Sequence, residues 1–111
     1  MEVAGKILEF EYENGERYRL LFGIKTVTWA CLAGSSAESF KTDYYSAIEI
    51  APKILFISWS KDDGEVANIV VNFQKDILYC CNAHEDTIDF WKGNIKIFAK
   101  ASINHANSYQ V

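Results

Sequence analysis

The amino-acid sequence predicts an all-β protein whose eight short strands form an antiparallel up-and-down β-barrel. Apolar and polar residues alternate with a period close to two along almost the whole chain, which is typical of strands with one buried face. Turn-forming residues interrupt this alternation at short intervals, and no amphipathic helical run is present. A β-sandwich also fits this pattern, but eight strands in up-and-down order favour a closed barrel, which has no exposed edge.

The first hairpin, over residues 6–22, is the clearest element. Asn14-Gly15 divides two alternating strands at 6–12 and 17–22, and this dipeptide tolerates the positive φ values of a two-residue turn. The alternation places the rings of Phe10, Tyr12 and Tyr18 on one face of the hairpin. Two phenol hydroxyls on an otherwise apolar face indicate a lined pocket as much as a sealed core.

The middle of the chain continues the same pattern. A strand is expected at 25–32 after Gly23, followed by a loop rich in small residues at 33–39. The next two strands, at 43–50 and 54–60, are separated by a turn around Pro52.

The last part of the chain completes the set of eight. A Gly-terminated loop precedes a strand at 66–73, on which Asn68 and Asn72 lie opposite Ile69 and Val71. The remaining segments are an expected strand at 77–82, a polar connection at 84–89 that closes with Phe90-Trp91, a strand at 94–102 and a frayed tail at 103–111. The chain is therefore read as one domain, residues 1–111.

Composition excludes several classes of function. The net charge is −4 and the positive side chains are scattered among acids, so no nucleic-acid partner is expected. No apolar run approaches the ~20 residues of a membrane-spanning helix, and no membrane contact is expected. The N-terminal residues lack the basic and apolar regions of a signal peptide, and the three cysteines fit reduced thiols better than a disulfide framework. A cytoplasmic location is therefore expected.

No metal site or cofactor is expected. The cysteines form no CxxC motif, and His84 and His105 show no ligand spacing with them. Cys80 or Cys81 is more easily read as a buried structural thiol than as a nucleophile, because a nucleophile needs a base within hydrogen-bond reach. No Gly-rich phosphate loop or nucleophile elbow is present.

The inward faces of the predicted strands define the candidate binding site. An eight-stranded barrel has room for side chains or for one small ligand, so large inward rings would confine a ligand to one open end. The candidate ligand-binding residues are Phe10, Tyr12, Tyr18, Trp29, Ile57, Trp59, Ile69, Val71 and Phe73. The expected partner is a small apolar or aromatic molecule, and the two phenols also allow an anionic one.

Several stretches resemble the MoaF-like family of the calycin superfamily, which has a lipocalin-like barrel. They are Gly5-Lys6, residues 10–15 with Tyr18, residues 26–29, Ala33-Gly34, residues 44–60 with their Ser-Trp-Ser strand, Asp63-Gly64 and residues 71–73. The same stretches resemble bacterial phenolic acid decarboxylases. The resemblance covers roughly residues 5–99 and implies an eight-stranded calycin barrel with an internal pocket, often in a homodimer.

Decarboxylase activity is not expected from this resemblance. The decarboxylases hold the substrate carboxylate with tyrosines of the first hairpin, and Tyr12 and Tyr18 match two of these positions whereas Phe10 has lost the hydroxyl. Lys61 stands where the decarboxylases have a glutamate, and Ser39 falls near the position of their arginine. Protonation of the substrate needs a positioned acid, and a lysine is a poor replacement for one.

The sequence therefore favours a small-molecule binding barrel without established catalysis. Two alternatives stay open. A lyase or isomerase would use the barrel tyrosines as acid–base groups. An interaction or dimerisation module would use exposed apolar residues such as Leu21 and Ile24.

Overall fold

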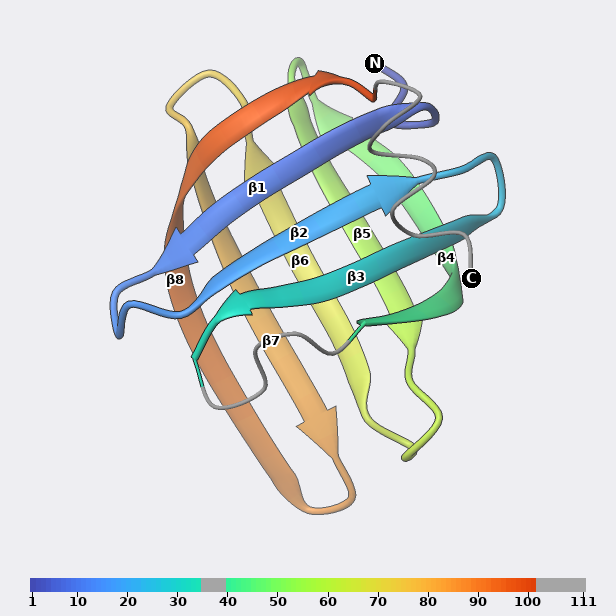
Figure 1. The fold of residues 1–111 in the computed structure, drawn as a ribbon, viewed down its shortest axis with the longest axis vertical. Helices are drawn as coiled ribbons and strands as arrows, with labels where there is room; N and C mark the ends of the chain where they lie inside the picture. Colours follow the sequence, from blue (N-terminus) through green and yellow to red (C-terminus); the bar gives the residue numbers. More distant parts are fainter. Residues whose placement is uncertain (35–39, 102–111) are drawn as a thin grey trace.

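The computed structural model describes residues 1–34 and 40–101, which form a closed eight-stranded antiparallel β-barrel (Figure 1). Each strand pairs with its neighbours in the sequence, and β8 pairs with β1 to close the barrel. The strands are β1 (Lys6–Tyr12), β2 (Arg17–Phe22), β3 (Thr26–Ala33), β4 (Phe40–Ala51), β5 (Ile54–Ser60), β6 (Val66–Asn72), β7 (Ile77–His84) and β8 (Thr87–Lys100). The predicted fold class is confirmed.

The loop expected at 33–39 lies mostly outside the described residues, as do Ser39 and the tail expected at 103–111. Within the described part of the chain, no helix is long and apolar enough to cross a membrane.

The turn of the first hairpin differs from the prediction of a two-residue loop. Tyr12 N donates to Glu16 O at 2.8 Å, and Gly15 N donates to Tyr12 O at 3.0 Å, so three residues form the loop. Gly15 has a φ of 91°, whereas Asn14 keeps an ordinary negative φ. Asn14 instead accepts a hydrogen bond from Glu16 N through Oδ1 at 2.9 Å, an Asx-type contact that favours the longer loop.

The polar connection predicted at 84–91 is also corrected. β8 already begins at Thr87 and pairs with β7, with Asp89 opposite Asn82 and Trp91 opposite Cys80. Alternation is present in this segment, but it is inverted: the apolar Ile88 and Phe90 face outward and are exposed. Backbone pairing with β7, rather than burial of an apolar face, therefore decides the conformation here.

The apolar core fills one half of the barrel. It is built from inward-facing aliphatic and aromatic side chains that are almost completely shielded from solvent. The largest of them are Phe22, Leu8, Leu20, Leu55, Ile57, Ile69, Leu78, Val27 and Val71. This packing closes the middle of the barrel, so the space for a ligand lies toward its ends.

Two cross-strand ion pairs join β1 and β2 on the outer face. Arg19 Nε contacts Glu9 Oε2 at 2.7 Å, and Arg17 Nε lies 3.6 Å from Glu11 Oε1. The Glu9 side chain is buried, with 7 % of its surface exposed, whereas both members of the Arg17 pair are exposed. Loss of one partner should therefore lower the stability more in the Glu9–Arg19 pair than in the Glu11–Arg17 pair.

Candidate ligand-binding pocket

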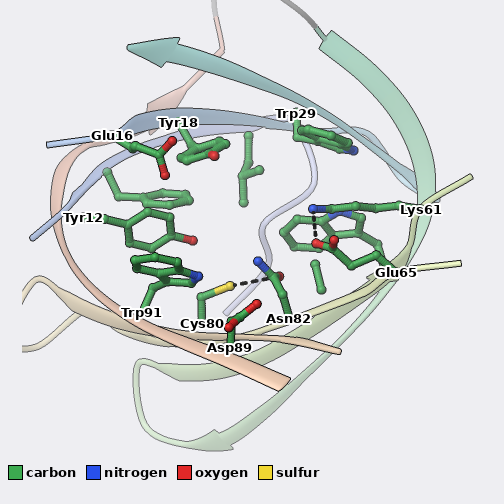
Figure 2. Close-up of a pocket in the computed structure, with 14 residues that line it drawn as sticks. Tyr12, Glu16, Tyr18, Trp29, Lys61, Glu65, Cys80, Asn82, Asp89 and Trp91 are labelled. Atoms are coloured by element: carbon green, nitrogen blue, oxygen red, sulfur yellow. Dashed lines mark hydrogen bonds and ion pairs between the residues drawn. The ribbon is translucent and has the colours of Figure 1, made fainter. Parts of the chain in front are cut away.

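A cavity of about 240 Å³ opens at the end of the barrel that carries the β1–β2, β5–β6 and β7–β8 hairpins. Fourteen residues line it (Figure 2). The aromatic ones are Phe10, Tyr12, Tyr18, Trp29, Trp59 and Trp91, the charged ones are Glu16, Lys61, Glu65 and Asp89, and the others are Leu20, Ala67, Cys80 and Asn82. Ring faces and edges therefore dominate the apolar lining, and the charged groups are mostly acidic.

One wall is a cluster of rings from β1, β2 and β8. The Tyr12 ring centroid lies 5.2 Å from that of Phe10, 5.4 Å from that of Tyr18 and 6.0 Å from that of Trp91. These separations fall within the range of favourable aromatic contacts. The cluster holds the Tyr12 ring in place, and in Figure 2 its hydroxyl points into the cavity.

The opposite wall holds a cation. Lys61 Nζ lies 4.7 Å from the Trp29 ring centroid and donates to Glu65 Oε1 at 2.7 Å. Trp29 Nε1 in turn donates to Asp43 Oδ2 at 2.9 Å, which fixes the ring beneath the ammonium. The ammonium is thus bound by a ring face and a carboxylate together.

A thiol and an amide from β7 also line the cavity. Cys80 Sγ donates to Asn82 Oδ1 at 3.3 Å, and burial raises the pKa of this thiol. The only histidine among the described residues, His84, contacts Asp63 O at 2.8 Å through Nε2. Cys80 therefore lacks the lowered pKa of a nucleophilic cysteine, and the described histidine is bound to a loop carbonyl instead of to this thiol.

Both pocket tyrosines are neutral hydrogen-bonding groups. Burial, and then the neighbouring Cys80, raises the pKa of the Tyr12 phenol far above its ordinary value. Burial, and then Cys31 and Glu16, raises the pKa of the Tyr18 phenol in the same direction. The protonated phenols can donate to a ligand, but neither readily becomes a phenolate base.

The burial of Tyr12 predicts a loss of stability in alkaline solution. Above pH ~10 the unfolded chain releases the Tyr12 proton and the native chain keeps it, so the free energy of unfolding falls by about 1.4 kcal/mol per pH unit from this group. Between roughly pH 9.5 and 11, the free energy of unfolding measured in urea should fall less steeply with pH for Tyr12→Phe than for the unmodified protein. The same substitution at the exposed Tyr44 is the control, and equal pH dependence in all three proteins would contradict the assignment.

The structure brings five of the nine sequence-predicted residues to the cavity: Phe10, Tyr12, Tyr18, Trp29 and Trp59. The other four do not line it. Ile57, Ile69 and Val71 are buried deeper in the core, and the Phe73 ring packs against Phe98 with their centroids 4.2 Å apart. As ligand contacts, all nine residues stay predictions.

Nine of the fourteen lining residues were absent from the predicted set, and they include the charged residues Glu16, Lys61, Glu65 and Asp89 and the ring of Trp91. The sequence marked Lys61 only through the resemblance, as the residue at the position of the decarboxylase glutamate. Asp89 and Trp91 alternate with outward-facing neighbours on β8, but those neighbours, Ile88 and Phe90, are apolar, so the hydrophobic pattern did not mark Asp89 as inward-facing. Glu16 and Glu65 stand next to turns, where side-chain direction follows from loop geometry and not from alternation.

These features define a β-barrel with a ring-lined cavity at one end, and the sequence places it in a family. Residues 4–96 match the model of the MoaF-like family, and the chain belongs to that family. Among solved structures it is similar to a chain described as a putative beta-lactamase from Burkholderia vietnamiensis. The TM-score is 0.79 at 16% sequence identity, over 86% of this chain and 95% of that one, which shows a shared fold. No curated protein matches the sequence.

Proposed function

We propose that this protein binds a small, partly aromatic or apolar molecule in the cavity at the open end of the barrel. The observation that carries the proposal is the unfilled volume of about 240 Å³ among six aromatic side chains. Ligand sites for drug-sized molecules span ~300–1,000 Å³, so a ligand with about one or two rings suits this cavity. The filled core below the cavity supports binding at the open end and not along the whole lumen.

Fixed polar groups give such a ligand an orientation. The Tyr12 and Tyr18 phenols are donors at neutral pH, because a phenol ordinarily has a pKa near 10 and burial raises the pKa of both groups further. Trp59 lines the cavity, and its buried Nε1 has no hydrogen-bond partner among the described residues. Aromatic rings combined with a few fixed polar groups are typical of binding sites for small molecules.

Binding is better supported than acid–base catalysis. A tyrosine that acts as a general base needs a pKa near the working pH, whereas burial moves the pKa of Tyr12 and Tyr18 away from it. Lys61, at the position of the decarboxylase glutamate, is held by Glu65. These contacts favour a binding site over a site of proton transfer.

The proposal predicts that a neutral bicyclic probe, indole, raises the melting temperature of the protein, since a ligand of the native state stabilises it. Trp91→Ala should weaken indole binding about tenfold, equivalent to about 1.4 kcal/mol, because the Trp91 ring forms part of the cavity wall. Calorimetric titration measures the change.

The matched control is Phe90→Ala. Phe90 adjoins Trp91 on β8 but faces outward and is 76% exposed, so its removal should change indole affinity by less than about twofold. Equal losses in the two variants, or no binding of indole to the unmodified protein, would count against the cavity as the site.

A further inference from the structure

We infer that the cavity selects a cationic ligand, a protonated arylalkylamine, over neutral and anionic molecules of the same shape. This inference rests on the proposed binding function and names the charge of the ligand. The two phenols alone also allow an anionic ligand, and the ligand inferred here carries the opposite charge.

The first argument is the charge balance of the lining. Three carboxylates, Glu16, Glu65 and Asp89, face one ammonium, Lys61. Lys61 is paired with Glu65 at 2.7 Å, which leaves Glu16 and Asp89 as an excess of two negative charges. Among the described residues, Glu16 accepts from the neutral Asn14 Nδ2 at 3.2 Å, and neither excess carboxylate has an ion-pair partner.

The second argument is that the pocket already shows how it binds a cation. On one wall the Lys61 ammonium lies between the Trp29 ring face and the Glu65 carboxylate. The opposite wall carries similar parts: in Figure 2 Glu16 lies beside the Tyr18 ring, and Asp89 lies beside Cys80, the residue that pairs with Trp91. None of the described lining residues on that side is a cation. A cation from outside would therefore find a ring face and a carboxylate on that wall.

The third argument concerns an anion in the same place. Lys61, the one cation among the described residues that line the cavity, already contacts Glu65 and Trp29, and an anionic ligand would have to displace Glu65 to reach it. The charge of Glu16 is felt inside the cavity, because it adds to burial and to Cys31 in raising the pKa of Tyr18. An anion beside Tyr18 would meet the same repulsion.

Three probes with the same ring test the sign of the charge: tryptamine, tryptophol and indole-3-propionate, which are cationic, neutral and anionic at pH 7. Calorimetric titration at low salt should give tryptamine at least about a tenfold higher affinity than indole-3-propionate, with tryptophol between them. The preference for tryptamine should shrink as salt is added, because the excess carboxylates lie near the mouth.

Two variants test the residues. Glu16→Gln and Asp89→Asn should each lower tryptamine affinity several-fold and change tryptophol affinity by less than about twofold. Glu13→Gln, in the same hairpin as Glu16 but exposed and outside the lining, should leave all three affinities unchanged.

The outcomes separate this inference from the proposed function. Binding of indole-3-propionate or tryptophol as tightly as tryptamine would overturn the cation preference and leave a binding cavity in place. A tryptamine preference that survives in both acid variants would overturn the roles of Glu16 and Asp89. No binding of any of these probes or of indole would overturn the proposed function itself.

Discussion

Replacement of Ile57 by alanine is expected to lower the free energy of unfolding by about 2–5 kcal/mol. Ile57 is 0% exposed and lies at the centre of the filled half of the barrel, between Ala47 on β4 and Ile69 on β6. The substitution removes buried methylene and methyl groups and leaves a hole that rigid neighbouring strands close only in part. Urea unfolding measures the loss.

The matched control is the same substitution at Ile48. Ile48 lies on β4, faces outward and is 63% exposed, so Ile48→Ala should cost less than about 0.5 kcal/mol. Ile57→Ala should also leave indole affinity within about twofold, because Ile57 does not line the cavity. A large loss of affinity with little loss of stability would restore Ile57 to the site, as the sequence pattern suggested.

Replacement of Arg19 by methionine is expected to cost about 3–5 kcal/mol of stability. Arg19 Nε contacts Glu9 at 2.7 Å, and the Glu9 side chain is buried. Methionine keeps much of the side-chain length but removes the positive charge, so a carboxylate is left in a poorly solvated place. The expected loss is measured by urea unfolding at pH 7.

The chain offers a close control for this prediction. Arg17 occupies the equivalent outward position two residues earlier on β2, but its pair with Glu11 is exposed and longer, at 3.6 Å. Arg17→Met should therefore cost no more than about 1 kcal/mol. Adding Glu9→Gln to Arg19→Met should recover part of the loss, and equal costs at the two arginines would argue against a buried charge.

The architecture was largely predictable because most of it follows from local patterns. Alternation with turn signals located every strand, and Asn14-Gly15 marked the first hairpin. The start of β8 was missed because its outward residues, Ile88 and Phe90, are apolar and exposed. In such a segment the hydrophobic pattern does not report which face is buried, and pairing with β7 decides the conformation.

The site was predictable only in part, for a related reason. Period-two alternation tells which residues point inward, but not how far along the barrel axis they lie. Trp59 and Ile57 share an inward face of β5, yet the first reaches the cavity and the second lies in the core. The acidic residues Glu16 and Glu65 flank turns, and their position follows from loop conformations that alternation does not encode.

The pairing of β1 with β8 also bears on how the barrel folds. It brings together residues from opposite ends of the described chain, such as Lys6 and Lys100, whereas every other pairing among the described strands joins sequence neighbours. The entropic cost of closing a loop rises with the length of chain enclosed, so this pairing is the least favourable one to form early in folding. Weakening it should therefore speed unfolding more than it slows folding, because contacts made after the transition state affect mainly the unfolding rate.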